Sequence, residues 1–263
     1  GPVGEMENEI IGKEDIRMRR IMVGKMRRYF SWENVRDFFK VPLGMIQCLY
    51  VLLAEMPDAI FSKGGYASVP VVLVGWLYRI PILIHESDAT PGVANDVLSK
   101  FADRVAIAYP EAEKEFPASQ TVLTGNPLRE DINQGDSKRI REKLSLIESK
   151  KVIYVTGGSQ GARAINNKIL NVLPALLHKY QVIHQTGKDN FAEVKHRAGE
   201  MGIKVGRDGY HAFPFIGEEL KDVYAVSDLV ISRSSATTIS EIAANGKPSI
   251  LIPLESSAND HQR

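Results

Sequence analysis

Residues 230–262 read V-I-S-R-S-S-A-T-T-I-S-E-I-A-A-N-G-K-P-S-I-L-I-P-L-E-S-S-A-N-D-H-Q. This stretch predicts a short apolar strand, a turn rich in hydroxyl groups, a helix, a Gly-Lys-Pro stop and a second apolar strand. Short apolar strands joined by a helix are typical of parallel sheets that helices cover on both faces. The stretch alone therefore predicts an α/β protein.

The same alternation of apolar runs and helical periods recurs along the rest of the chain. The runs lie at residues 59–62, 82–85, 104–108, 152–156, 181–185, 229–232 and 249–253. A polar, charged segment at residues 131–150 separates them into two series. We therefore expect two doubly wound domains, 1–132 and 133–263, with a ligand cleft at the carboxyl ends of their strands.

The composition argues against several classes of protein. With 33 Lys and Arg against 32 Asp and Glu among 263 residues, general nucleic-acid binding is not expected. A single cysteine, Cys48, rules out an internal disulfide and fits a reducing compartment, where we expect it to pack as a small buried residue. The apolar run at residues 41–54 is shorter than the roughly 20 residues that span a bilayer.

The N-terminal region combines basic and aromatic residues. Lysines and arginines cluster between Lys13 and Arg28, and aromatic side chains follow up to Phe39. This pattern fits either a solvated basic face beside a core helix or contact with an anionic lipid surface. The chain begins Gly-Pro without methionine and stops shortly after a predicted strand, so we expect a fragment of a longer protein.

The turn at residues 156–162, T-G-G-S-Q-G-A, follows one strand and opens a helix. Glycines let the backbone approach an anion, the helix start offers free N–H groups, and Ser159 adds a hydroxyl. A tight turn without a ligand is the alternative. The turn resembles half of a dinucleotide-binding fingerprint, but Thr156 replaces the first glycine. The next strand ends H-Q-T-G-K at residues 184–188, with no acidic residue there to hold an adenosine ribose, which disfavours NAD.

The turn at residues 233–241, R-S-S-A-T-T-I-S-E, offers a second helix start to an anion. Glu241 suits the hydroxyl pair of a ribose, and the D-H-Q triplet at 260–262 ends the next strand on the ligand side of the sheet. Thr238 with Glu241 also fits a capping box, which is a purely structural role. The combination favours a sugar nucleotide as the ligand.

Polar loops also follow two strands of the first domain, at residues 61–68 and 85–92. His85 beside Glu86 is a candidate acid–base pair, but neighbours on a strand point to opposite faces unless a turn begins there. Arg129 either reaches a phosphate or base, or forms an ordinary salt bridge. The sequence holds no Asp-x-Asp pair, cysteine cluster or His-Glu-x-x-His segment for a metal.

Taken in order, these motifs resemble the MurG family of bacterial glycosyltransferases over nearly the whole chain. The matching segments are G-K-M-R-R-Y-F-S-W at 24–32, S-K-G-G-Y-A-S-V-P at 62–70, H-E-S-D-A-T-P-G-V-A-N at 85–95, G-N-P-L-R at 125–129, G-G-S-Q-G-A-R-A-I-N at 157–166, H-Q-T-G-K at 184–188, R-S-S-A-T-T-I-S-E at 233–241 and D-H-Q at 260–262. Each is weak alone, but their order is highly specific.

The resemblance implies the GT-B arrangement of two Rossmann-like domains and an inverting glycosyl transfer. The 4-hydroxyl of the muramoyl unit of an undecaprenyl-diphosphate-linked pentapeptide precursor attacks UDP-N-acetylglucosamine, at the cytoplasmic face of the bacterial plasma membrane, to which the enzyme binds peripherally. No cofactor or nucleic-acid partner is implied, and dependence on a divalent cation stays open. The alternatives are another GT-B enzyme, such as a UDP-sugar epimerase or an antibiotic glycosyltransferase, and a nucleotide-sugar-binding protein without catalysis.

The resemblance also implies a set of site residues. On the donor side these are Arg129, Ser159, Ile216, Ala236, Thr237, Thr238, Ile239, Ser240, Glu241 and Gln262. Elsewhere in the cleft they are Tyr66, Asp88, Asn95, Gly158, Asn166 and Arg233. The catalytic base is unassigned, because the family's histidine-bearing glycine-rich loop is not in this sequence; His85 and Glu86 are the candidates within it. Whether the chain itself turns the donor over or only binds it stays open.

Two further implications concern the surface and one substitution. The family's membrane-binding patch maps to Phe38, Phe39, Val41, Leu43, Met45, Trp76 and Leu77. Ser235 stands where the family pattern has glycine, and we expect this bulkier residue to crowd the donor phosphate.

Overall fold

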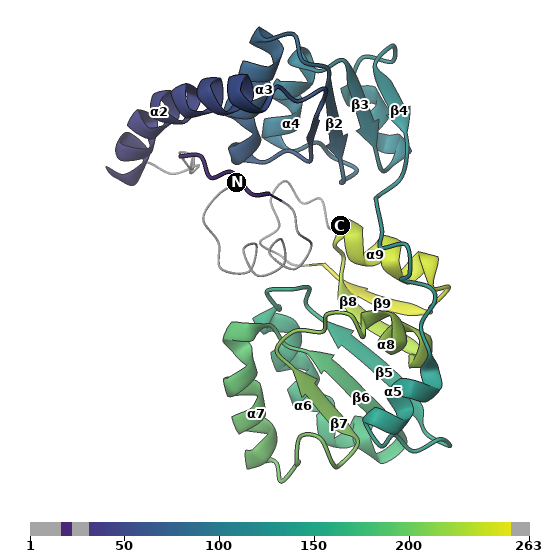
Figure 1. The fold of residues 1–263 in the computed structure, drawn as a ribbon. Helices are drawn as coiled ribbons and strands as arrows, with labels where there is room; N and C mark the ends of the chain where they lie inside the picture. The colour runs from purple at the N-terminus through teal and green to yellow at the C-terminus, as the bar shows by residue number, and fades with distance from the viewer. Residues whose placement is uncertain (1–16, 23–31, 254–263) are drawn as a thin grey trace. The chain divides into compact units, whose positions relative to one another are not determined.

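The computed structural model describes the backbone of residues 17–22 and 32–253, and the side chains of 17–22 and 42–253. It divides into two compact units, Gly1–Gly125 and Asn126–Arg263 (Figure 1). Each unit contains a parallel sheet flanked by helices, which confirms the predicted α/β class.

The first unit is built on four parallel strands in the order β1-β2-β3-β4. Their bounds are Ile60–Ser62, Ile82–Glu86, Arg104–Ile107 and Thr121–Leu123. The helices are α2 (Trp32–Glu55), α3 (Val69–Leu77) and α4 (Val93–Leu98), and short 3₁₀ helices span Tyr66–Ser68, Ser99–Phe101 and Pro110–Glu115. The core lies between one face of the sheet and these helices, and Val72, Ile84 and Val105 at its centre are fully buried.

Helix α2 contains the apolar run that the sequence places near a membrane. No helix in the described part of the chain is long and apolar enough to cross a bilayer. Cys48 packs in the core, as predicted. The described basic segment, residues 17–22, lies along α2, because the Met22 amide donates to Gln47 Oε1 over 2.7 Å and a Cβ on Gly44 would come within 2.1 Å of the Met22 carbonyl oxygen.

The second unit has five parallel strands in the order β7-β6-β5-β8-β9. Their bounds, in chain order from β5, are Lys151–Thr156, Tyr180–Gln185, Tyr210–Phe213, Leu229–Arg233 and Ser249–Ile252. The helices are α5 (Ser137–Lys143), α6 (Arg163–Lys179), α7 (Phe191–Glu200), α8 (Leu220–Val226) and α9 (Ala236–Ala244), with a 3₁₀ helix at Lys188–Asn190. From central β5 the chain winds to one side and then returns to β8, so the switch point for ligand binding lies between β5 and β8.

Both faces of this second sheet are covered. Alternate residues of β5 enter different cores: Val152 and Tyr154 pack with α5, α8 and α9, whereas Ile153 and Val155 pack with α6 and α7. This explains why the strands read as continuous apolar runs instead of alternating ones.

The division between the units falls after residue 125, earlier than the boundary that we placed after residue 132. Ile132 is buried in a core of the second unit, Leu128 packs against the same core, and Asp131 pairs with Lys221 of α8 at 2.6 Å. The polar composition of residues 131–150 indicated that this segment is exposed. The packing of Leu128 and Ile132, and not that polarity, decides that the chain after residue 125 belongs to the second unit.

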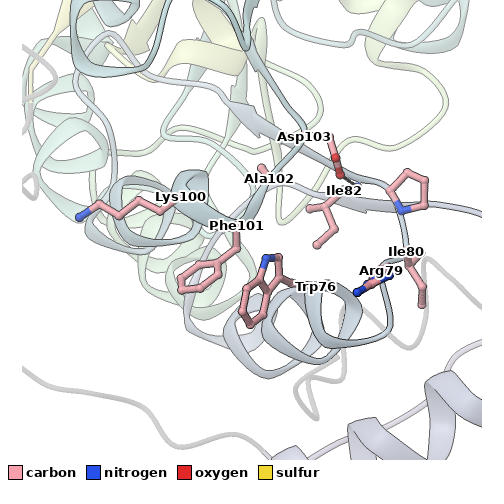
Figure 2. A pocket seen from close by; sticks show the side chains of 9 residues that line it. Trp76, Arg79, Ile80, Ile82, Lys100, Phe101, Ala102 and Asp103 are labelled. Carbon is pink, nitrogen blue, oxygen red and sulfur yellow. Dashed lines mark hydrogen bonds between the residues drawn. The ribbon is translucent and has the colours of Figure 1, made fainter.

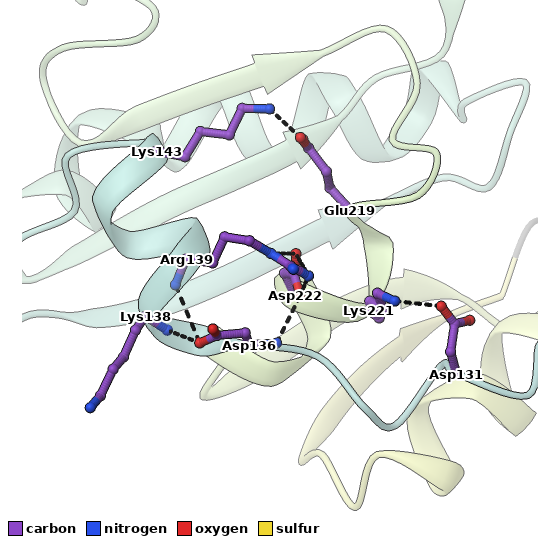
Figure 3. A network of polar contacts seen from close by, with 8 residues as sticks. All are labelled: Asp131, Asp136, Lys138, Arg139, Lys143, Glu219, Lys221 and Asp222. Atoms are coloured by element: carbon purple, nitrogen blue, oxygen red, sulfur yellow. Dashed lines mark hydrogen bonds and ion pairs between the residues drawn. The ribbon is translucent and has the colours of Figure 1, made fainter.

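A polar network fastens α5 to α8 (Figure 3). The Asp136 carboxylate caps α5 by accepting from the amides of Lys138 and Arg139 at 2.8 and 3.3 Å. Buried Asp222 accepts from the Asp136 amide at 2.7 Å and from two nitrogens of the Arg139 guanidinium at 2.6 and 2.8 Å. The network fixes α8, which also carries Tyr224, a residue of the candidate site.

Candidate functional site

The turn after β5 folds back tightly onto the start of α6. Gly158 has φ +82° and donates its amide to Thr156 Oγ1 over 3.0 Å. A Cβ on Gly157 would lie 2.2 Å from the Ala162 amide nitrogen, so only glycine fits there. The turn thus brings the backbone of residues 157–162 to the carboxyl end of β5.

Gln185, at the end of β6, ties this turn to the loop after β7. Its amide nitrogen donates to the Gly158 carbonyl at 3.1 Å and to Thr156 Oγ1 at 3.3 Å. Its Oε1 accepts from the Ile216 amide at 2.8 Å. The side chain is buried and fully engaged, so it supports two loops from below and does not face a ligand.

The turns after β5 and β8 lie against each other. A Cβ on Gly158 would meet Nε and Nη2 of Arg233, the last residue of β8, at 3.0 Å. Among the described residues nothing accepts a hydrogen bond from the buried Nε of Arg233. A guanidinium thus lies at the switch point, next to the first residues of α6 and α9.

Helix α9 begins earlier than a capping box would require. Its N-cap is Ser235, whose hydroxyl donates to Thr238 Oγ1 at 2.8 Å, and Thr238 lies inside the first turn. The capping-box interpretation of Thr238 and Glu241 is therefore wrong: helix periodicity indicated the segment but not its first residue. Ser235 has φ −92° and ψ 138°, an ordinary extended conformation, so serine in place of glycine puts no strain on the backbone here.

Glu241 projects from α9 towards a pair of buried tyrosines. Its Oε2 accepts from the Tyr224 hydroxyl at 2.9 Å, and the Tyr224 ring packs edge-on against Tyr154 with centroids 5.5 Å apart. Burial raises the pKa of Glu241, and the Tyr224 hydrogen bond and the charge of Arg129 oppose that rise. Arg129 is held nearby by donating to the Gly217 carbonyl at 2.9 Å.

The remaining donor-side residues are placed as follows. Ser240 donates its hydroxyl to the Ala236 carbonyl at 2.9 Å, Thr237 and Ser159 are exposed, Thr238 is buried, and Ile239 and Ala236 are half-buried. The Ile216 amide is taken by Gln185, which leaves only its carbonyl for a base. Gln262 lies outside the described residues.

Asn166 lies beneath the site. It is buried on α6, donates to the Thr186 carbonyl at 2.9 Å and accepts from His184 Nε2 at 3.0 Å. His184 in turn accepts from the Tyr210 hydroxyl at 2.9 Å, and burial lowers its pKa to about 3, so it is neutral. His184 is therefore a satisfied buried group, and Asn166 supports the start of α6 from below.

In the first unit, His85 and Glu86 do not form an acid–base pair. His85 Nε2 donates to the Gly125 carbonyl at 2.9 Å, which places Nδ1 as the acceptor for the Ser87 hydroxyl at 3.4 Å. The Glu86 carboxylate accepts from the amides of Asp88 and Gly92, both at 3.0 Å, and from Asn95 Nδ2 at 2.9 Å. Glu86 therefore orders the loop after β2.

Asp88, Asn95 and Tyr66 are the other predicted cleft residues of the first unit. Asp88 is half-buried and donates its amide to Glu86. Asn95 is buried, and its Oδ1 would lie 2.5 Å from a Cβ on Gly64, in the loop after β1. Tyr66 is 39% exposed on that loop. Within the described residues, no three His, Cys, Asp or Glu side chains are grouped so as to hold a metal ion.

Two roles escaped the sequence analysis. Gln185 entered only as part of the matching segment at 184–188. Tyr224 was not singled out, because its partner Glu241 is 17 positions away and no motif links them. The buried helix position of Tyr224 between apolar neighbours is the only local signal.

Comparison with known protein families identifies the class of protein to which the chain belongs. Residues 2–107 match the glycosyltransferase family 28 N-terminal domain, and residues 152–263 match its C-terminal domain. The UDP-N-acetylglucosamine--N-acetylmuramyl-(pentapeptide) pyrophosphoryl-undecaprenol N-acetylglucosamine transferase of Clostridium perfringens is 43% identical over 98% of this chain and 70% of its own length. The corresponding transferase 2 of Bacillus anthracis is 41% identical over 97% of this chain and 70% of its own length.

Solved structures agree. MurG of Acinetobacter baumannii matches with a TM-score of 0.66 and 28% identity, over 98% of this chain and 68% of that one. The UDP-GlcNAc 2-epimerase of Neisseria meningitidis matches with a TM-score of 0.62 and 14% identity, over 97% of this chain and 73% of its own. At that identity the likeness shows a shared fold alone. The chain belongs to the MurG family of N-acetylglucosamine transferases within glycosyltransferase family 28, and its two Rossmann-like units have the GT-B fold.

Proposed function

We propose that this chain is the donor-binding and transferring part of an enzyme that moves N-acetylglucosamine from UDP-N-acetylglucosamine to the undecaprenyl-diphosphate-linked muramoyl pentapeptide of peptidoglycan synthesis. One observation carries the proposal: the turns after β5 and β8 meet at the switch point, with the Arg233 guanidinium against Gly158 and Glu241 on the helix that follows. The family membership supports the same activity.

The geometry fits a nucleoside diphosphate. The free amides at the starts of α6 and α9, together with Arg233, form a positive environment for the diphosphate. As the glycosidic bond to UDP breaks, negative charge grows on the leaving phosphate, and these fixed donors stabilise it without rearranging. Glu241 accepts from ribose hydroxyls, and Arg129 and the Ile216 carbonyl contact the base.

The reaction proposed is a single displacement. The 4-hydroxyl of the muramoyl unit attacks the anomeric carbon, its proton passes to a base, the bond to the UDP oxygen breaks, and the configuration inverts. We do not assign the base to His85 or Glu86, because His85 donates to Gly125 and Glu86 is saturated by three donors.

Transfer of radiolabelled N-acetylglucosamine by the complete open reading frame that contains this chain tests the activity. The acceptors are a short-chain lipid-linked muramoyl pentapeptide and, as control, a soluble sugar without the muramoyl unit. The proposal predicts label in the lipid-linked product alone. Label converted to a 2-epimer, or found in the soluble sugar, would support an epimerase or an antibiotic glycosyltransferase instead; label staying in UDP-N-acetylglucosamine would argue against transfer.

We also propose that the enzyme binds peripherally to the cytoplasmic face of the membrane through the first unit. Leu43, Trp76 and Leu77 of the predicted patch are 51, 55 and 61% exposed, and Ile46 and Tyr50 add to the outer face of α2. Met45 does not belong to the patch, because it packs against the core. The side chains of Phe38, Phe39 and Val41 lie outside the described residues.

A groove beside Trp76 supports the same proposal (Figure 2). It has a volume of about 300 Å³, and Trp76 packs edge-on against Phe101 with ring centroids 5.3 Å apart. Arg79 and Lys100 line the same groove. An aromatic side chain flanked by cations suits the boundary between anionic headgroups and acyl chains.

A further inference from the structure

The carboxylate of Glu241 is held from one side only. Oε2 accepts from the Tyr224 hydroxyl at 2.9 Å, and no described residue donates to Oε1. The Tyr224 ring is itself fixed, since it is fully buried and packs edge-on against Tyr154 at an interplanar angle of 85°. The hydroxyl that orients Glu241 therefore belongs to a rigid part of the second unit.

We propose that Tyr224 is a positioning residue: its hydroxyl fixes the Glu241 carboxylate so that Oε1 accepts from the ribose hydroxyls, and this sets the preference of the site for ribonucleotides over 2′-deoxyribonucleotides. The inference rests on the proposed function, because it takes UDP as the ligand. Tyr224 does not touch the nucleotide and acts only through Glu241.

Rigidity is what gives the interaction its selectivity. A glutamate side chain has several rotamers, and a site that fixes one of them loses less entropy when the ribose binds. A 2′-deoxyribose leaves such a preoriented carboxylate oxygen without one of its donors, whereas a freely rotating carboxylate turns to solvent at little cost. Loss of the Tyr224 hydroxyl therefore weakens ribose binding more than deoxyribose binding.

The same contact gives a pH signature. The titratable and charged groups that face Glu241 are Tyr224 of α8, Tyr154 of β5 and Arg129 of the loop between β4 and α5. Burial raises the pKa of Glu241, while Tyr224 and Arg129 oppose the rise. Removing the Tyr224 hydroxyl raises the pKa of Glu241 further. In the variant the Glu241 carboxylate therefore becomes protonated at a higher pH than in the parent, and ribose binding is lost at that higher pH.

Titration calorimetry of UDP and 2′-deoxy-UDP against the parent chain and Tyr224→Phe tests this. Phenylalanine keeps the ring contact with Tyr154. We expect Kd for UDP to rise roughly tenfold and Kd for 2′-deoxy-UDP less than about twofold, so that the discrimination ratio falls. The pH below which UDP binding weakens should move upward in the variant.

Tyr210→Phe is the matched control, since it removes another buried tyrosine hydroxyl of the second unit, one that donates to His184. This variant should leave unchanged both the ratio of the Kd values for 2′-deoxy-UDP and UDP and the pH below which UDP binding weakens. Glu241→Ala should abolish the discrimination, and in the double variant Tyr224→Phe should have no further effect.

Equal weakening of UDP and 2′-deoxy-UDP in Tyr224→Phe, or full additivity with Glu241→Ala, would overturn the inference and leave the proposed function standing. If the parent chain binds no UDP, the proposed function fails and the inference fails with it. Circular dichroism of each variant separates misfolding from loss of positioning. Should Tyr224→Phe misfold, 3-fluorotyrosine at position 224 replaces it, because it keeps the ring and makes the hydroxyl a stronger donor. The pH below which UDP binding weakens should then move downward, and an unchanged pH dependence would overturn the inference.

Discussion

At the scale of single residues, the second unit contains two carboxylates with opposite properties, buried Asp222 and half-buried Glu241. Asp222 accepts three hydrogen bonds, from the Asp136 amide and the Arg139 guanidinium; burial opposes its ionisation, but these donors hold its pKa below the ordinary value. Glu241 receives one hydrogen bond and has a raised pKa, because burial dominates. A fully satisfied carboxylate stabilises the fold, whereas one with an oxygen left over is suited to a ligand.

Replacement of Asp222 by asparagine should therefore change stability in a pH-dependent way. A carboxyl whose folded pKa is depressed stabilises the fold above its unfolded pKa, about 3.9, and this stabilisation is lost as pH falls through the lower folded pKa. Urea unfolding at pH 7 should show Asp222→Asn less stable by about 1–2 kcal/mol, with the difference shrinking below about pH 4.

Asp189→Asn, at an exposed position, is the control for that measurement and should change little at any pH. If Asp222→Asn were destabilised equally at pH 7 and pH 3, the stabilisation would come from packing and not from the charge, and the interpretation of the network in Figure 3 would be wrong.

At the scale of elements, α2 and α3 carry the proposed membrane contact. Sedimentation with phosphatidylglycerol vesicles should show Trp76→Ala binding at least about fivefold more weakly than the parent, because a large exposed aromatic group no longer enters the interface. Phosphatidylcholine vesicles should bind the parent less well, since they offer no net charge to Arg79 and Lys100.

Tyr180→Ala provides the matched control, because it removes a partly exposed aromatic side chain from the second unit. Vesicle binding that falls equally in both variants would refute the assignment of the membrane-binding surface to α2, α3 and the groove of Figure 2. Equal binding of the parent to both kinds of vesicle would refute it as well.

Element ends were also where sequence reasoning was least accurate. The strand–helix order of residues 230–252 was predicted, because apolar runs and helical spacing report burial directly. The start of α9 was misplaced, since Ser235 and Thr238 are both good N-caps and only the backbone conformation decides between them. Likewise, adjacent His85 and Glu86 suggested a pair, although the turn after β2 sends them to different partners.

At the scale of the whole molecule, the fold class, the two-unit organisation and the family followed from the sequence, whereas the internal supports of the site did not. Gly158, Arg233 and Glu241 lie in segments whose composition suits a nucleotide, so a sequence pattern indicates them. Gln185 and Tyr224 hold those turns through contacts across many sequence positions, and only coordinates reveal such contacts. The boundary near residue 125 was missed for a similar reason, because the packing of Ile132 decides it.

We propose that the donor diphosphate binds where the turns after β5 and β8 meet. The most direct measurement is calorimetric titration of UDP and of uridine against the parent chain and Arg233→Ala. We expect one UDP per chain in the parent and a loss of UDP affinity of roughly tenfold or more in the variant. Uridine binding should be unchanged, because uridine lacks the diphosphate that we propose as the partner of the guanidinium next to Gly158. An equal loss for UDP and uridine, or unchanged UDP binding, would contradict it.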